Sequence, residues 1–222
     1  MNYFDLLDRL HQLYYKCAGQ ELTAKQICYK LNRTIPTRDV RVYRLESIGV
    51  LDNKFELSGL YDPELDQDSK QCILIEIQFP VRKPTFCFDE SDLSFAHWHE
   101  LAVDIASIVG HEFVHMGQFR RRHFNEGRFY RSQEKNLFFK ECQEYYGMND
   151  EIDAYAFTAA ASMALEKFVY QKKTVNIKKT PTYQIYRHYF RKDTKIIDLL
   201  VKKSTTYYRR LERQYRDKYN KK

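Results

Sequence analysis

A long segment without proline, from Leu93 to Phe119, constrains the fold of this chain more than any other part of its sequence. Leu101, Ile105, Ile108 and Val109 recur within it at helical spacing, so one side of the segment is apolar. An apolar helix face of this length has to be covered by other elements. The pattern therefore predicts a buried central helix.

The residues before this segment carry two different patterns. Apolar residues at helical spacing predict helices over 2–17 and 23–32. From Arg38 the chain changes to short runs rich in β-branched and aromatic residues, separated by turn-prone Asp-Asn, Asp-Pro and Asp-Gln-Asp segments. These runs predict a small, mainly antiparallel sheet, and they read VRVYRL, KFELSGLY, CILIEIQF and, more weakly, VRKPTFCF.

The residues after the central segment predict a helical C-terminal half. Residues 120–148 read as a basic loop with a short helix near LFFKECQEYY. Asn149 and Asp150 offer N-cap chemistry to an alanine-rich helix from about Glu151 to Tyr170. Two further helical patterns follow, roughly at 182–191 and 194–218. Together the elements predict an α+β fold in one domain over 1–222, with N-terminal helices at 1–33, the sheet at 38–90, central helices at 93–175 and a basic helical tail at 181–222.

The composition excludes several classes of protein. With 222 residues, 43% of them apolar, the chain can bury a substantial core. It has no run of about 18 apolar residues and no signal-peptide pattern at its start, so we expect neither a membrane span nor Sec-dependent secretion. The five cysteines are odd in number and lack CxxC spacing, which predicts reduced thiols in a cytosolic setting.

The net charge is +7, and much of the excess lies in the last 21 residues. Nine Lys and Arg there are accompanied by only two acidic residues, Glu212 and Asp217. A solvated basic helix is the simpler interpretation of this tail. A surface that contacts nucleic acid is the alternative.

The central helix contains an HExxH motif, His111-Glu112-Phe113-Val114-His115. Four residues of α-helix turn through about 400°, so the two imidazoles project from nearly the same face, as two ligands of one tetrahedral metal require. Zinc (Zn²⁺) is the expected ion, and Glu112 is placed to accept a proton from water and pass it to a leaving amine. The alternative, two surface histidines on a solvated helix, is disfavoured by the apolar surroundings.

A catalytic zinc ion needs a third protein ligand. The extended pattern HExxHxxGxxH fails, because Gln118 and Arg121 occupy the positions of its glycine and third histidine. Glu151 is the best candidate, since antiparallel packing of its helix on the central helix would direct the carboxylate at the histidine pair. His123, in a basic run that disfavours a cation, and Asp153, on another side of its helix, are the rivals. Glu134 and Glu144 read as ordinary surface carboxylates.

Two segments, HEFVHMGQFRRR and YYGMNDEIDAYA, resemble the HExxH … EIxAYA pattern of gluzincin-type zinc metallopeptidases, notably those encoded by bacteriophages. The resemblance covers residues 97–165 and is loose elsewhere. It implies a zincin-like fold, with a small sheet before the HExxH helix and a glutamate-bearing helix after it. It also implies His111, His115 and Glu151 as zinc ligands and Glu112 as general base.

The chain departs from this resemblance at one supporting position. Where larger gluzincins read ExxxD, it has Glu151 followed by Tyr155, so the aspartate that orients a histidine ligand is missing. Asp104 and Asp153 are candidates for that task. A donor to the developing oxyanion is also required. The candidates, each of which could instead serve packing, are Tyr145, Tyr146, Tyr155, Tyr183, Tyr186 and His188.

These features predict a zinc metallopeptidase that cleaves protein or peptide substrates. The alternative is a phage virion or assembly protein with a vestigial peptidase domain, whose basic tail contacts nucleic acid, phage structural proteins or a second copy of the chain. A zinc protease acting on DNA-bound proteins is a third hypothesis. With the phage resemblance, these hypotheses place the protein in the host cytoplasm or in the virion.

Overall fold

The computed structural model describes residues 2–44, 55–79, 85–89 and 91–220. The chain divides into two compact units, Met1–Phe113 and Val114–Lys222, and the long helix α4 (Asp92–Arg121) contributes to both. Among the described residues, no helix combines the length and apolarity that a membrane crossing needs. That the whole chain acts as one domain stays a prediction.

The first unit contains helices and all of the described strands. Its elements before α4 are α1 (Tyr3–Lys16), β1 (Glu21–Thr23), α2 (Ala24–Thr34), β2 (Val40–Arg44), β3 (Glu56–Tyr61), α3 (Pro63–Gln67), β4 (Ile73–Gln78) and β5 (Thr85–Cys87). A capping box between Thr23 and Gln26 fixes the start of α2. The side chain of Asn2 accepts hydrogen bonds from the first turn of α1 in the same way.

The strands form two small sheets. β4 lies between β2 and β3, parallel to β2 and antiparallel to β3, while β1 pairs with β5 in an antiparallel ribbon. Alternation explains the two faces of β4, because Ile73, Ile75 and Ile77 are fully buried while the residues between them are half-buried. The prediction of an α+β fold with a small, mainly antiparallel sheet is confirmed, with β2–β4 as its parallel pair.

Helix α4 packs on the apolar face of the three-stranded sheet. Gly59 of β3 is in register with Ile75, and a β-carbon at Gly59 would lie only 2.2 Å from Cγ2 of Ile108 on α4. The strand backbone therefore lies directly against the helix, as only glycine permits there. Nearer the start of α4, the indole of the buried Trp98 donates to the carbonyl of Leu10 on α1.

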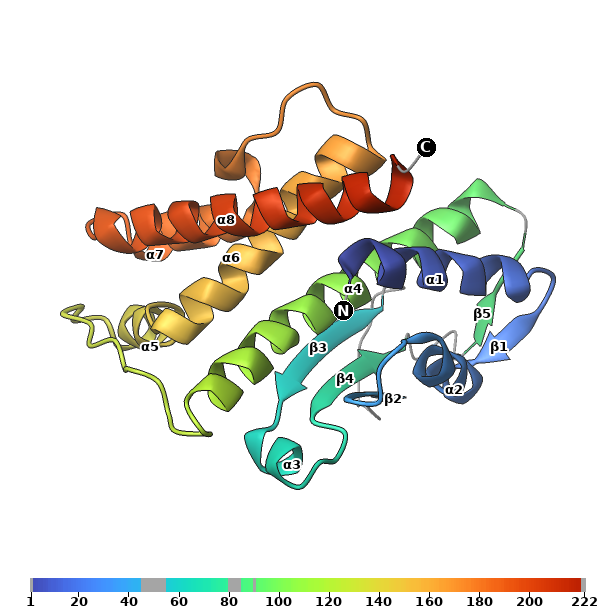
Figure 1. The fold of residues 1–222 in the computed structure, drawn as a ribbon, viewed down its shortest axis with the longest axis horizontal. Coiled ribbons are helices and arrows are strands. Elements are labelled where there is room, and N and C mark those ends of the chain that lie inside the picture. Colours follow the sequence, from blue (N-terminus) through green and yellow to red (C-terminus); the bar gives the residue numbers. More distant parts are fainter. Residues whose placement is uncertain (1, 45–54, 80–84, 90, 221–222) are drawn as a thin grey trace. The chain divides into compact units, whose positions relative to one another are not determined.

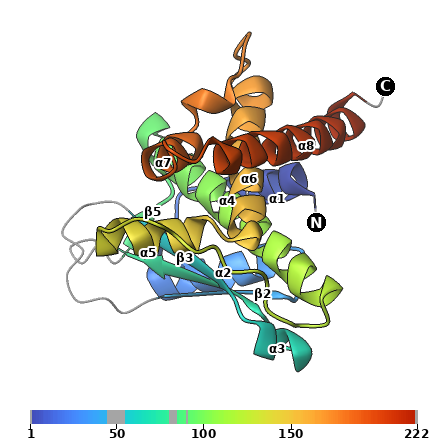
Figure 2. The ribbon, with the colours of Figure 1, turned by 90° about the vertical axis from the view of Figure 1, so that its left-hand side faces the viewer.

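The second unit is helical, as predicted for the C-terminal half. Its elements after α4 are α5 (Leu137–Tyr146), α6 (Asn149–Ala164), a π-helical turn (Leu165–Val169), a 3-10 turn (Ile177–Lys179), α7 (Pro181–Tyr189) and α8 (Thr194–Tyr219). α8 runs across α6 (Figures 1 and 2), where buried alanines let the two helices approach closely. Ile152, Tyr186, Phe190 and Leu200 form the centre of this packing.

One detail of the predicted helix start is wrong. The N-cap of α6 is Met148, which makes no side-chain cap, and Asn149 and Asp150 already lie inside the helix. Asp150 is instead held by Arg122, whose two terminal nitrogens lie 2.8 and 2.6 Å from its carboxylate oxygens. A bidentate pair of this kind is stronger than a neutral cap hydrogen bond. It fixes the start of α6 to the turn that follows α4.

Candidate metal centre

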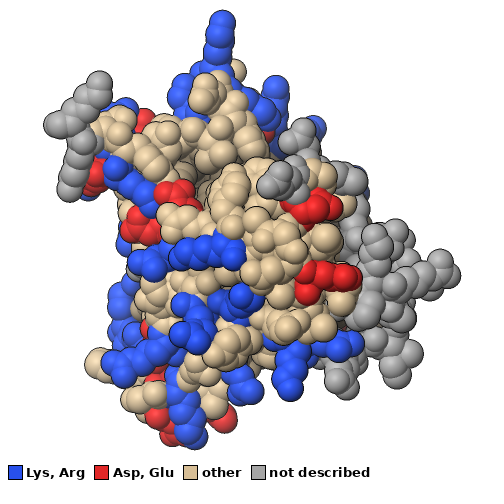
Figure 3. All heavy atoms as spheres, turned by 90° about the vertical axis from the view of Figure 1, so that its right-hand side faces the viewer, with Lys and Arg blue, Asp and Glu red and all other residues tan. Residues whose placement is uncertain are grey.

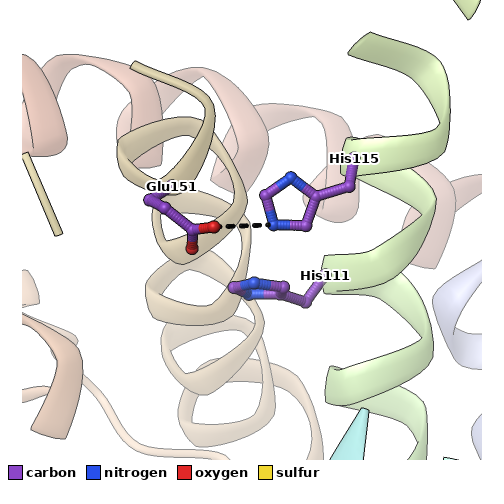
Figure 4. Close-up of side chains that lie close together, drawn as sticks. All are labelled: His111, His115 and Glu151. Carbon is purple, nitrogen blue, oxygen red and sulfur yellow. Dashed lines mark ion pairs between the residues drawn. The ribbon is translucent and has the colours of Figure 1, made fainter. Parts of the chain in front are cut away.

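The two histidines of the HExxH motif project from the same side of α4, toward Glu151 on α6 (Figure 4). One nitrogen of each imidazole and one oxygen of Glu151 all lie within 4.8 Å of one another. Within the described part of the chain, this is the one group of His, Cys, Asp or Glu residues close enough to hold a metal ion. The three residues predicted as ligands are therefore brought together.

Glu151 occupies the first turn of α6, where the helix dipole favours a negative charge. Its exposed fraction is only 8%, and Oε1 lies 3.5 Å from Nε2 of His115. Burial, reinforced by the charge of Asp150, raises the pKa of Glu151 to about 7, although a hydrogen bond from Tyr145 opposes the rise. A metal ion would keep this buried carboxylate ionised at neutral pH.

His115 is held in one tautomer by Gln118, one turn later on α4. Nδ1 of His115 lies 3.0 Å from Oε1 of Gln118. A carbonyl oxygen can only accept, so the proton sits on Nδ1 and the lone pair of Nε2 points at Glu151. Burial lowers the pKa of His115, more than the neighbouring carboxylates raise it, which favours the neutral ring that binds metals.

The orientation of the Gln118 amide is fixed by its other end. Nε2 of Gln118 donates to the carbonyl of Asp150 at 3.1 Å and to Oδ2 of Asp153 at 3.2 Å. A flipped amide would place an oxygen against both of these acceptors, so the assignment is determined by the network. Asp153 thus supports His115 through Gln118.

The same aspartate connects the site to α8. Nζ of Lys203 lies 2.9 Å from Oδ1 of Asp153. Burial, together with the charge of Asp153 and a hydrogen bond to it, raises the pKa of Tyr207 to about 12. A chain of polar contacts therefore runs from His115 through Gln118 and Asp153 to Lys203 and Tyr207.

The donor set fits a metal ion. The lone pair of Nε2 on His115 and a carboxylate oxygen of Glu151 face one another. These two acceptor atoms repel each other, and a cation bound to both would remove that repulsion. Two donors bound at about 2.0–2.1 Å to a tetrahedral ion are roughly 3.4 Å apart, close to the 3.5 Å between these atoms. Two imidazoles and one carboxylate also leave a tetrahedral position for water or substrate. The three residues could therefore hold a divalent metal ion.

Glu112 lies next to the first histidine and is 7% exposed. A β-carbon at Gly59 would come within 3.1 Å of its Oε1, so the carboxylate approaches the backbone of β3. Within the described residues β3 is an edge strand of its sheet. The predicted general base is thus placed between the helix that carries the histidines and a strand edge.

The rival ligands have other environments. His123 is exposed and lies in the turn after α4 with a φ of 51°. Asp153 is engaged by Gln118 and Lys203. Glu134 accepts the backbone N–H of the next residue, and Glu144 accepts that of Ser132.

Among the candidate oxyanion donors, Tyr145 is hydrogen-bonded to a member of the ligand set. Tyr145, nearly half exposed, donates to Glu151 and in turn receives a hydrogen bond from Tyr155. Tyr186 is fully buried and donates to the carbonyl of Tyr146. Tyr146 stacks on Tyr189, His188 packs on Phe139, and Tyr183 is half-buried.

Sequence reasoning missed the role of Gln118. Its spacing of three residues from His115 on one helix is the signal that could have identified it. Comparison of the chain with protein-family models, with curated proteins and with solved structures finds no significant match.

Proposed function

We propose that this protein is a zinc-dependent metallopeptidase. The observation that supports the proposal most directly is the convergence of His111, His115 and Glu151. Two neutral imidazoles and one carboxylate are a donor set used by catalytic zinc sites of peptidases. The resemblance of the HExxH and EIxAYA segments to gluzincins supports the same reaction.

The protein residues have distinct tasks in this proposal. His111, His115 and Glu151 would hold a zinc ion, which when bound acts as a Lewis acid and lowers the pKa of water toward about 7. The carboxylate of Glu112 accepts the proton of the attacking water and returns it to the nitrogen of the leaving amine. Tyr145, whose hydroxyl reaches Glu151, is the nearest candidate to donate to the carbonyl oxygen under attack.

The edge of β3 is a suitable place for the substrate. An extended peptide can add to a strand edge through backbone hydrogen bonds, which bind many sequences alike. Gly59 of β3 approaches Glu112, so a peptide aligned there would pass close to the proposed base. Side chains beside the strand would then determine which residues are accepted.

The decisive experiment compares the parent protein with a Glu112→Gln variant on a mixed peptide library, with products identified by mass spectrometry. We expect the parent to cleave after zinc loading, to stop after treatment with a strong chelator and to recover when zinc is returned. Glu112→Gln should lose about 10²-fold or more of the rate, since general-base catalysis contributes about 10²–10⁴-fold.

Glu100→Gln is the matched control, because Glu100 lies on the same helix and is exposed. It should cleave like the parent. Equal cleavage by Glu112→Gln and Glu100→Gln, or cleavage that survives complete removal of metal, would contradict the proposal.

A further inference from the structure

Positive charge is concentrated in the second unit. Residues 114–222 contain 25 Lys and Arg against 12 Asp and Glu, a formal charge of +13. Residues 1–113 contain 12 against 18, a formal charge of −6. Such separation of charge within one chain is typical of proteins that bind a polyanion. The candidate metal centre does not explain this excess of positive charge, because its proposed ligands are two histidines and a glutamate.

The cations of α8 form a stripe. Lys195, Lys202, Arg209 and Arg216 recur every seven residues, which is close to two helical turns, and Arg213 lies beside them. All five are exposed. The stripe is about 32 Å long at a rise of about 1.5 Å per residue. The opposite side of α8 is buried against its own unit through Leu200, Ser204 and Leu211.

Few carboxylates neutralise this stripe. Arg216 pairs with Glu212 at 2.8 Å. For the described residues, no ion pair within 4.0 Å is found for the other four members of the stripe. Lys203, which points toward α6, is by contrast paired with Asp153. Lys203 is thus a paired inner cation of α8, whereas four of the five exposed cations in the stripe have no such carboxylate partner among the described residues.

A second group of lysines lies next to the C-terminal half of α8. The ring of Phe168 stacks on those of Tyr208 and Tyr215, with a centroid distance of 4.5 Å to Tyr215. These contacts hold the start of the segment 166–179, at Phe168, beside α8. Its lysines are Lys167, Lys172, Lys173, Lys178 and Lys179, of which Lys172 is paired with Glu166 at 2.6 Å. Lys and Arg side chains gather at the top of Figure 3, where Figure 1 shows this segment.

The aromatic residues argue for a duplex rather than a single strand. Proteins that bind single strands stack bases on exposed rings. Tyr208 and Tyr215 are stacked on Phe168, and Tyr207 packs on Phe157. Tyr219, at the end of the helix, and Tyr170, in the segment 166–179, are exposed, but neither belongs to the row of cations. The stripe therefore offers charges to phosphates and no platform for bases.

The same helix is poorly suited to a membrane surface. An interfacial helix inserts an apolar face between lipids. Of the apolar residues of α8, Leu200 and Leu211 are buried inside the second unit, and Ile196, Ile197 and Leu199 are partly buried against its core. An anionic membrane would meet only the charged side of α8.

We infer that the α8 stripe, extended by the lysines of residues 166–179, binds the phosphodiester backbone of double-stranded nucleic acid without reading its sequence. The regular row of exposed cations suits the regular row of phosphates on a duplex. The inference is independent of peptidase activity, because none of its residues belongs to the metal centre. It gives a protease of this kind a means to act where proteins are bound to nucleic acid.

The test measures binding of the full chain to fluorescent duplex DNA, duplex RNA and single-stranded DNA of equal length by anisotropy, over about 50–200 mM NaCl. We expect both duplexes to bind more tightly than the single strand. The logarithm of the binding constant should fall linearly with the logarithm of salt concentration, with a slope of about −4 to −5 for four or five phosphate contacts. A difference in affinity between duplex DNA and duplex RNA would identify which of the two nucleic acids the protein prefers.

The variant Lys202→Gln/Arg209→Gln/Arg213→Gln removes the centre of the stripe. Each lost phosphate contact should reduce the salt slope by about 1, so the slope should fall by about 3 and affinity by roughly tenfold or more near physiological salt. Glutamine is a good helix former, so α8 should persist. Circular dichroism and a thermal melt verify this.

The matched control removes three exposed cations of the first unit, as Arg9→Gln/Lys16→Gln/Lys25→Gln. The change in net charge is the same, and we expect a loss of less than about twofold. An equal loss in both variants would overturn the assignment to α8. Tighter binding to the single strand, or binding to vesicles containing phosphatidylserine without binding to duplexes, would overturn the choice of partner.

Discussion

Oε1 of Gln118 accepts a hydrogen bond from Nδ1 of His115 at 3.0 Å. This contact determines which nitrogen of the ring is available, because a proton on Nδ1 leaves the lone pair on Nε2. The amide is fixed in turn by Asp153, which Lys203 holds from α8. Gln118 thus orients His115 in the way that a carboxylate beside a histidine ligand orients the ring in known metal sites.

Substitution Gln118→Leu should therefore weaken metal binding while the three ligands remain. Loss of a residue that orients a ligand typically lowers metal affinity by about 10–100-fold. Competition with a coloured chelator for Zn²⁺ measures this directly, without any assay of activity. Gln133→Leu, at an exposed position of the same unit, is the control and should bind like the parent.

The variant Asp153→Asn tests whether Asp153, which holds the amide of Gln118, also contributes to the orientation of His115. An asparagine keeps the shape of the side chain but weakens its attraction for Lys203 and its hold on the Gln118 amide. We expect an affinity between those of the parent and of Gln118→Leu. Parent-like affinity in both variants would show that His115 needs no partner on its Nδ1.

Substitution Glu151→Gln should have opposite effects on the metal-free and the metal-bound protein. The pKa of Glu151 is raised to about 7, so its ionisation opposes folding as pH rises above the unfolded value near 4.5. At pH 8 a neutral amide should stabilise the metal-free protein by about 1–2 kcal/mol. The same change should abolish most of the stabilisation that Zn²⁺ provides to the parent.

Thermal melts with and without Zn²⁺ at pH 8 measure both effects. Glu144→Gln, a carboxylate engaged with Ser132 and Lys140 at the surface, should change neither. A Glu151→Gln protein that retains the full zinc-dependent rise in Tm would remove Glu151 from the ligand set.

Much of the fold follows from the sequence because its elements have clear periods. The short helix near LFFKECQEYY coincides with α5, and the alternation of CILIEIQF coincides with β4. The parallel pairing of β2 with β4 did not follow, because strand order depends on contacts that local periodicity does not encode. β1 and α3 were missed because three and five residues are too short to show a period.

The three candidate ligands could be predicted from the sequence more readily than the residues that orient them. His111 and His115 are fixed to one helix face by their spacing, and Glu151 lies in the first turn of the next well-patterned helix after a short one. Gln118 carries no charge and matches no motif, so only its hydrogen bonds reveal it. Lys203 lies 50 residues beyond Asp153, and no local pattern predicts so distant a pair.

Substitution Gly59→Ala should destabilise the first unit. The added β-carbon would lie 2.2 Å from Cγ2 of Ile108, well inside van der Waals contact, so β3 or α4 must shift. Overpacking of this kind typically costs about 1–3 kcal/mol. Chemical denaturation measures the loss. In an Ile108→Ala background the methyl has room, and the additional cost of Gly59→Ala should largely disappear.

Gly117→Ala is the control for a glycine without a close contact. Its β-carbon would meet Nη1 of Arg121 at 3.5 Å, an ordinary distance. Alanine is favoured over glycine within a helix by about 1 kcal/mol, so this variant should be as stable as the parent or more so. If Gly59→Ala is equally harmless, β3 does not lie as close to α4 as the structure shows.

Acid should destabilise the first unit through His11 on α1 and His99 on α4. Nε2 of His11 lies 2.9 Å from Nδ1 of His99, so one ring donates and the other accepts in a neutral pair. Burial, and then the proximity of His99, lowers the pKa of His11 to about 4, although Asp8 opposes the shift; burial also lowers the pKa of His99, against the pull of Glu100.

Because the folded pKa of His11 lies below the unfolded value near 6.5, the stability that it contributes is complete above pH 6.5 and is lost as pH falls toward 4. After allowance for solvent screening of a half-buried ring, the loss should be on the order of 1 kcal/mol by pH 5. Urea denaturation at pH 7 and pH 5 measures it. His11→Gln, which can still hydrogen-bond but does not titrate, should flatten this dependence, whereas His97→Gln, at an exposed position of α4, should preserve it. An unchanged dependence in His11→Gln would mean that the acid sensitivity arises elsewhere in the chain.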